Sequence, residues 1–96
     1  MILMLLEILT PDALLFSGQV EVVEIPTLTG VIGVFPHHTP LTTLVVPGRI
    51  KFIAKEKVGR ILEEANFLFE NNHTVLEVDA GVVYLDGDKV RIFVRF

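Results

Sequence analysis

Three histidines are the residues of this sequence best suited to bind a metal, but their spacing is not that of a metal site. His37 and His38 are adjacent, and His73 lies far along the chain. Adjacent residues of an extended segment point in opposite directions, and no Asp or Glu lies near the pair to complete the three protein ligands of a zinc site. A metal-assisted enzyme would need all three histidines to converge. We therefore interpret them as surface or interface residues and expect neither a metal nor another cofactor.

The other residues that could do chemistry also lack partners in sequence. The Asp-Gly-Asp segment at 86–88 lacks the spaced oxygen ligands of a calcium loop and is typical of a tight turn. Ser17 is the only serine and has no acid–base partner nearby. No GxxxxGK[ST] motif occurs, and the Gly-x-x-Gly segment at 30–33 is too short for a dinucleotide loop. The sequence therefore predicts no catalytic residues and a protein that is not an enzyme.

Charge excludes one class of partner and singles out one part of the chain. The formal net charge is −4, whereas nucleic-acid binding depends on clustered Lys and Arg. Residues 25–48, a quarter of the chain, contain no Asp, Glu, Lys or Arg. Four prolines interrupt this stretch, so we expect no direct membrane span. Two compatible interpretations remain for it: buried core strands joined by Pro/Gly turns, and a docking surface.

Alternating apolar and polar residues predict strands along most of the chain. The segment 89–96 alternates as a half-buried strand, 82–85 is its hairpin partner across the turn at 86–88, and 74–78 completes a C-terminal meander. Further strands are expected at 2–9, 14–16, 19–25, 31–35, 41–46 and 49–54. A turn is expected at Ser17-Gly18, between the second and third of these strands. We predict an all-β fold, an antiparallel sandwich or flattened barrel of about ten strands, as a single domain over residues 1–96.

Two segments depart from simple alternation. The pattern slips between Val22 and Val23, which indicates a β-bulge or two buried faces. Residues 57–70 fit helical spacing and strand alternation equally well, so an insertion near 56–72 is expected to be a short helix or an extended hairpin.

The order of the motifs resembles that of a known family. TPDALLFSG at 10–18, the Gly30-x-x-Gly33 pair and FPHHTPLTTLVVPG at 35–48 resemble the N-terminal β-sandwich of the epsilon subunit of F-type ATP synthase, called delta in mitochondria. The resemblance is continuous over residues 5–54. The segment VLEVDAGVVYLDGDKVRIFV at 75–94 agrees with the end of that sandwich.

The resemblance implies a function and a set of contacts. It implies a non-catalytic rotor subunit of the central stalk of a proton-translocating F-type ATP synthase, in which the sandwich binds the gamma subunit and contacts the ring of c subunits. It thereby couples proton transport to ATP synthesis, in a peripheral membrane complex on the cytoplasmic face of a bacterial inner membrane or the equivalent organelle face. By position, the gamma-facing residues are Thr10, His38 and Thr43, and the c-ring-facing hairpin consists of Thr29, Gly30, Val31, Ile32 and Gly33.

Departures from the family pattern accompany these expectations. Val31 and Ile32 stand where many members have an acidic or polar residue, and His37 replaces a common glycine. Gly33→Val should harm the hairpin if Gly33 adopts a positive φ. The family's C-terminal helical hairpin is not expected here.

A stand-alone β-sandwich that binds carbohydrate or lipid is the alternative function. The absence of Trp and the presence of a single Tyr argue against a sugar site, because such sites use aromatic rings as a platform.

Overall fold

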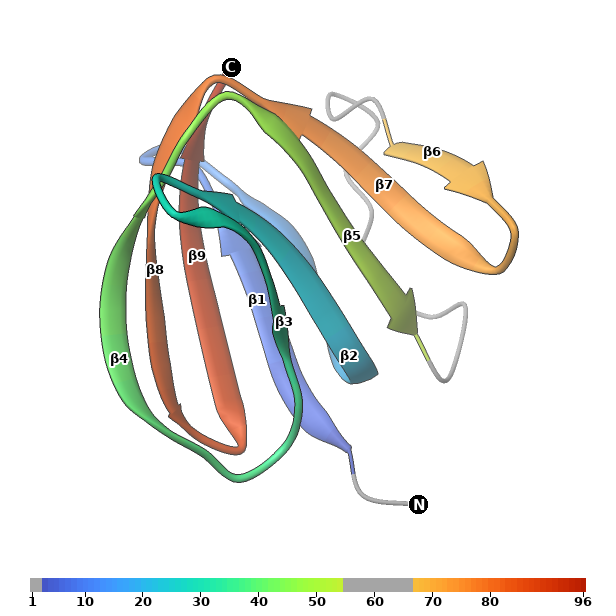
Figure 1. Cartoon of the computed structure of the whole chain (residues 1–96). Coiled ribbons are helices and arrows are strands. Elements are labelled where there is room, and N and C mark those ends of the chain that lie inside the picture. The colour runs from blue at the N-terminus through green and yellow to red at the C-terminus, as the bar shows by residue number, and fades with distance from the viewer. Residues whose placement is uncertain (1–2, 55–66) are drawn as a thin grey trace.

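The computed structural model describes residues 3–54 and 67–96, and these residues are almost entirely β-strand (Figure 1). This confirms the all-β prediction. The described residues form nine strands, which are β1 (Met4–Leu9), β2 (Leu14–Thr27), β3 (Gly30–Val34), β4 (His38–Val45), β5 (Gly48–Ala54), β6 (Phe67–Glu70), β7 (His73–Val78), β8 (Ala80–Gly87) and β9 (Lys89–Arg95).

The strands form a two-layered sandwich in which one strand belongs to both layers. The order is β4-β8-β9-β1-β2-β5-β7-β6, and β3 pairs separately with β2. The first part of β2 pairs with β1, whereas its last part pairs with β5 and β3. The register against β5 shifts between Val20 and Val23, which confirms the irregularity expected at Val22-Val23. Within the described residues β4 and β6 are free ends of this path, so the sheet is not closed into a barrel.

One strand pair is an exception to the predicted antiparallel arrangement. Strands β1 and β9 run parallel, with Leu5 opposite Lys89 and Leu9 opposite Phe93. Parallel strands need a long connection, and almost the whole chain lies between these two. Alternation within each strand indicates which residues are buried but carries no information on the direction of a distant neighbour.

The turn expected at Ser17-Gly18 is wrong, because β2 continues through both residues. Ser17 lies opposite Glu7 and Gly18 opposite Leu6 in an unbroken ladder with β1. A Cβ atom added to Gly18 would lie 3.0 Å from the Phe16 ring. Gly18 therefore makes room for this buried ring and does not reverse the chain.

The expected C-terminal meander is also wrong in part. Strands β8 and β9 form the predicted hairpin, with Gly87 at φ 61° in the turn. Strand β7, however, pairs with β5 and β6 and not with β8. The chain therefore passes from one layer to the other at Asp79, whose backbone N–H donates a hydrogen bond to the carbonyl oxygen of Arg95.

The segment of ambiguous pattern is a hairpin where the structure describes it. Strand β6 pairs with β7 through a turn in which Asn71 and Asn72 have φ of 47° and 68°. Residues 67–72 therefore agree with the extended-hairpin alternative. The expectation for 56–66 lies outside the described residues.

The core lies between the layers and is wholly apolar at its centre. Phe52 is fully buried, and its ring packs 4.5 Å from that of Phe16 and 6.3 Å from that of Phe67. The residues that are at most 1% exposed come from both layers and include Met4, Leu6, Ile8, Val20, Val23, Ile25, Ile50, Phe52, Leu76, Val83, Val90 and Ile92.

We predict that Gly81→Ala destabilises the fold, because a Cβ atom at Gly81 would collide with the backbone carbonyl oxygen of Phe93. Backbone cannot rotate away as a side chain can, so the free energy of unfolding should fall by about 2 kcal/mol or more. Urea denaturation would measure this change.

The matched control is Gly33→Ala. The φ of Gly33 is not positive, and its nearest contact for an added Cβ is an ordinary 3.7 Å from Phe35. A side chain at Gly33 was expected to harm the hairpin only if this residue had a positive φ, which it does not have. The free energy of unfolding of Gly33→Ala should therefore stay within about 1 kcal/mol of the wild-type value. Equal stability losses in the two variants would contradict the steric explanation.

Candidate protein interaction surfaces

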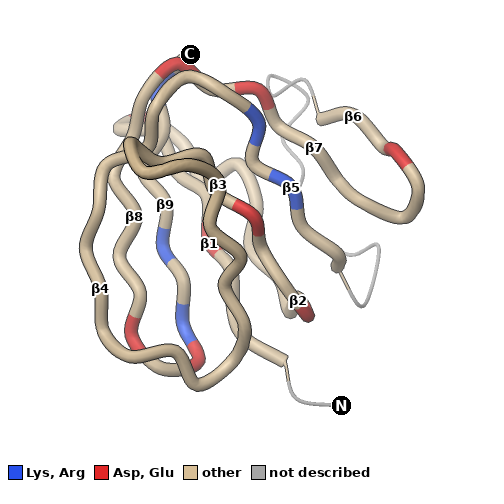
Figure 2. Tube along the Cα trace, in the orientation of Figure 1, with Lys and Arg blue, Asp and Glu red and all other residues tan. Residues whose placement is uncertain are grey.

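The uncharged stretch contributes Ile25, Val34 and Val45 to the core, but most of its residues are not buried. Figure 2 shows that β3, β4 and the loop between them carry no Asp, Glu, Lys or Arg. Of the residues of β4, only Val45 is buried, and β3 likewise buries only Val34. Large apolar side chains of this stretch are exposed instead, namely Leu28, Val31, Phe35, Leu41 and Leu44. An exposed apolar surface without charges is typical of the centre of a protein interface.

The three residues expected to face gamma lie at separate points around one layer. Thr10 follows the end of β1, where its side-chain oxygen accepts a hydrogen bond from the Ala13 N–H at 3.1 Å. His38 begins β4 opposite Gly87, at the other end of the layer. Thr43 lies opposite the buried Val83, so its side chain is on the inner side of the edge strand β4. The fold does not bring these three side chains into contact with one another.

The hairpin expected to face the c-ring has its turn at Leu28-Thr29, and Gly30 already belongs to β3. The Thr27 hydroxyl donates a hydrogen bond of 2.6 Å to the Gly30 carbonyl oxygen, which ties the turn together. Gly30 has φ of 113°, which a glycine adopts without strain.

The residues expected to face the c-ring do not all point outward. Thr29, Gly30, Val31 and Gly33 are exposed, whereas Ile32 packs against the core from a position opposite Ile25. Val31 alone is therefore an exposed large apolar side chain within the expected set.

Exposed apolar residues that the sequence patterns did not single out complete this picture. Leu28 is 78% exposed at the tip of the hairpin. On the outer face of the other layer, Leu44, Tyr84 and Phe93 are exposed. The pairing of β9 with β8 and of β8 with β4 brings Phe93 and Tyr84 near Leu44, and no pattern within a single strand shows this neighbourhood.

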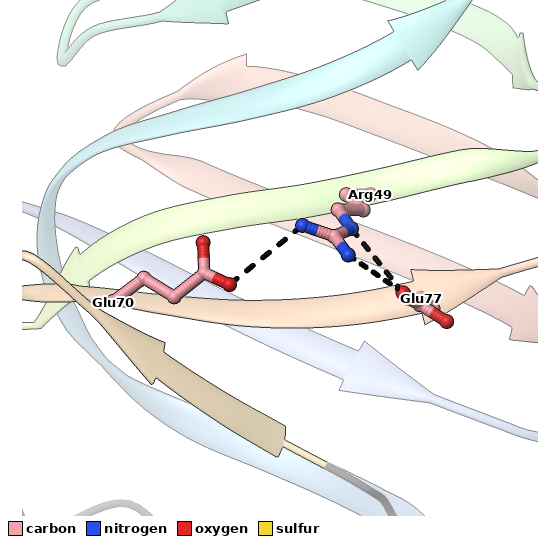
Figure 3. A network of polar contacts seen from close by, with 3 residues as sticks. All are labelled: Arg49, Glu70 and Glu77. Carbon is pink, nitrogen blue, oxygen red and sulfur yellow. Dashed lines mark hydrogen bonds and ion pairs between the residues drawn. The ribbon is translucent and has the colours of Figure 1, made fainter.

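Strands β5, β7 and β6 carry exposed ion pairs that the uncharged stretch lacks. On β5, β7 and β6, Arg49 lies between two acids, with nitrogen–oxygen distances of 3.0 Å to Glu77 and 3.7 Å to Glu70 (Figure 3). These groups are about half exposed, so the ion pairs contribute little to stability. These three charged side chains are solvated in the free chain.

The histidines have separate local partners. The His37 Nδ1 atom lies 3.0 Å from an Asp88 carboxylate oxygen, and His37 has φ of 67°, a backbone that glycine also adopts readily. The rings of His38 and His73 each contact a nearby backbone carbonyl oxygen. Among residues 3–54 and 67–96, no three His, Asp or Glu side chains are grouped as metal ligands. In the same residues no helix is long and apolar enough to cross a membrane.

Comparison with solved structures shows the fold. A chain of the central stalk and c-ring structure of the Tetrahymena thermophila mitochondrial ATP synthase superimposes with a TM-score of 0.72 at 15% identity, over 97% of this chain and 63% of that one. A chain of the Euglena gracilis mitochondrial ATP synthase also gives 0.72 at 15% identity, over 96% of this chain and 50% of that one.

Comparison of sequences shows the family. The ATP synthase epsilon chain of Persephonella marina is 35% identical over 90 residues, which are 94% of this chain and 56% of the relative. That of Aquifex aeolicus is 40% identical over 53 residues, which are 55% of this chain and 40% of the relative. This chain thus spans about half the length of these relatives. The family model described as "ATP synthase, Delta/Epsilon chain, beta-sandwich domain" matches residues 3–96, and the chain belongs to that family.

Proposed function

We propose that this chain is a non-catalytic rotor subunit in the central stalk of a proton-translocating F-type ATP synthase. The observation that carries the proposal is the exposed, uncharged surface of β3, β4 and their loop in a sandwich of this family. A surface that a partner covers permanently would incur the cost of desolvating any charge it left unpaired. Thr and His can form hydrogen bonds and still pack, which suits them to such a surface.

The gamma subunit is the proposed partner of Thr10, His38 and Thr43. His38 and Thr43 belong to β4, an edge strand whose residues are mostly exposed on both sides. An edge strand presents unpaired backbone donors and acceptors in addition to its side chains. Pro40 lacks a backbone donor and therefore limits strand-to-strand pairing at this edge, which favours contact through side chains.

The c-ring is the proposed partner of the β2–β3 hairpin. Its exposed residues Thr29, Gly30, Val31 and Gly33 carry no charge, and Leu28 at the tip adds apolar area. Ile32 supports the hairpin from the core side and is assigned no contact. A chain that binds gamma and the ring together would rotate with both and help to couple proton transport to ATP synthesis. It would then lie in a peripheral membrane complex on the cytoplasmic face of a bacterial inner membrane, or on the equivalent organelle face.

Co-purification tests this function directly. The chain is expressed with the gamma subunit of the same organism, and both are followed by size-exclusion chromatography beside the chain alone. A stable one-to-one complex is the expected result. Separate elution of two folded proteins would contradict the proposal.

We predict that His38→Glu weakens gamma binding while the fold stays intact, because His38 is only partly buried at the start of β4. Binding would bury a new charge without a partner, so the dissociation constant should rise by at least about tenfold. Isothermal titration calorimetry measures the affinity, and thermal unfolding checks the fold.

His73→Glu is the matched control for this variant. His73 is also partly buried, and its ring likewise contacts a nearby backbone carbonyl oxygen, but it begins β7 next to the charged surface. Its affinity for gamma should equal that of the wild type. Wild-type affinity in His38→Glu would remove this residue from the contact.

We predict that Val31→Lys, a charge opposite in sign to the acidic residue of many family members, weakens attachment to the c-ring and leaves gamma binding unchanged. Val31 is 65% exposed in free solution, so the charge should cost little stability until a partner covers it. ATP-driven proton pumping by the reconstituted enzyme would measure coupling, which should fall. Leu68→Lys on β6, at 44% exposure, is the control that should pump normally.

A further inference from the structure

The turn at Pro36-His37 joins β3 to β4 and puts a histidine in a backbone conformation that favours glycine. His37 has φ of 67°, which lies in the left-handed region. A proline followed by a residue of positive φ is typical of the two central positions of a type II turn, the second of which is usually Gly or Asn. Residues with a larger side chain adopt this conformation uncommonly and at a cost. An interaction outside the turn is therefore needed to offset the cost at His37.

Asp88 supplies such an interaction from the turn between β8 and β9. One of its carboxylate oxygens accepts a hydrogen bond of 3.2 Å from the backbone N–H of His37. The same oxygen lies 3.0 Å from the Nδ1 atom of the His37 ring. The two residues are 51 positions apart in the chain, and their turns lie side by side at one end of the layer (Figure 1). The Asp88 side chain thus ties the β3–β4 loop to the β8–β9 hairpin.

The backbone of Asp88 is itself held in place. Its carbonyl oxygen accepts a hydrogen bond of 2.7 Å from the backbone N–H of Leu5. Next to it, Gly87 has φ of 61° in the tight turn and lies opposite His38 of β4. The carboxylate therefore projects from a turn that is fixed to β1 and β4. Of the two turns that it joins, the β3–β4 loop is the one whose conformation depends on the contact.

The contact acts through backbone geometry more than through charge. The side chains of His37 and Asp88 are 64% and 58% exposed, and ion pairs between exposed groups contribute little to stability. A hydrogen bond to the backbone N–H, in contrast, favours one orientation of the peptide group of His37. Loss of the Asp88 carboxylate should consequently change the conformation of the loop with little effect on the stability of the whole fold.

The conformation of His37 matters because His38 follows it directly. His38 begins β4, and the ladder between β4 and β8 is irregular from His38 to Leu41. The regular part of that ladder, from Leu41 to Val45, therefore does not by itself fix the direction of the His38 side chain. The backbone angle of the preceding residue contributes to this direction, and Asp88 holds that residue.

We propose that Asp88 is a positioning residue for gamma binding, which holds His37 in its left-handed conformation and so presents His38 to the gamma subunit. This inference rests on the proposed function, and it assigns a role to a residue that need not touch gamma. It also gives a physical reason why this chain keeps the turn with a histidine where many family members have glycine, since the carboxylate offsets the cost of the side chain.

Removal and conservative replacement of the carboxylate test the role of Asp88. Asp88→Ala should raise the dissociation constant for purified gamma by about threefold to tenfold, because only a fraction of the molecules would then hold the loop in the binding conformation. Asp88→Asn keeps an oxygen that accepts the hydrogen bond from His37, so its affinity should stay within about twofold of the wild type. Isothermal titration calorimetry measures both, and thermal unfolding checks that each variant is folded.

A double-mutant cycle with His37→Gly separates positioning from direct contact. Glycine adopts a positive φ without help, so the loop of this variant no longer needs the carboxylate. In the His37→Gly background, Asp88→Ala should therefore change the dissociation constant by less than about twofold. An equal loss of affinity in both backgrounds would show that Asp88 does not act through His37, and would overturn the inference.

Hydrogen exchange in the free chain tests the contact without gamma. By NMR, the backbone N–H of His37 should exchange at least about threefold faster in Asp88→Ala than in the wild type, because its acceptor is gone. Asp86→Ala is the matched control, since it removes an equal charge from the same hairpin and leaves the His37 contact in place. Unchanged exchange in Asp88→Ala, or an equal increase in Asp86→Ala, would contradict the role given to Asp88.

The outcomes separate this inference from the proposed function. If the wild type binds gamma and Asp88→Ala binds it equally well, the positioning role is wrong and the function stands. If the folded wild type does not bind gamma, the function is wrong and the role of Asp88 in gamma binding is wrong with it. Weaker binding by Asp88→Ala, with its rescue in Asp88→Asn and in the His37→Gly background, would support both.

Discussion

The passage of β2 from one layer of the sandwich to the other is the constraint on which the rest of the structure depends. The strand pairs with β1 up to Val20 and with β3 from Val23 onward, and its ladder with β5 spans the register shift between them. Val20 and Val23 flank that shift, and both are fully buried. A bulge lets two residues of one strand oppose one residue of its neighbour, which bends the strand and allows both halves to face the same core. The two layers are therefore parts of one hydrogen-bonded path.

This arrangement separates the outer surface into regions of different chemistry. Strands β5, β7 and β6 present the Arg49 ion pairs, which water solvates, whereas β3 and β4 at the other end of the structure present no charge (Figure 2). The exposed apolar residues Leu44, Tyr84 and Phe93 lie on the uncharged edge strand β4 and its neighbours β8 and β9. A contact made by the uncharged region would bury no unpaired charge, which is costly to remove from water.

Sequence patterns were reliable where a structural feature depends on neighbouring residues. The hairpin at 86–88 needs only a residue with positive φ between two alternating strands, and the bulge at Val22-Val23 interrupts a local alternation. Patterns failed where the feature depends on a distant neighbour. The Ser17-Gly18 pair is typical of a turn, yet the ladder to β1 and the Phe16 ring keep it extended. Strand β7 alternates like β8 and directly precedes it in the chain, which predicted that the two would pair. Its partners are instead β5 and β6.

The sequence by itself determined the all-β class, most strand positions, the uncharged quarter and the family, because each follows from residue types in a local order. Only the tertiary structure decided which strands are neighbours, and therefore which exposed residues are grouped together. Leu44, Val82, Phe93 and Leu9 are far apart in the chain and form one row only through the pairing of four strands. Likewise, alternation places Val31 and Ile32 on opposite faces, but only the position of the core shows which of them is exposed. Pairing over long sequence distances is a cooperative result of burying the whole core, and no local pattern encodes it.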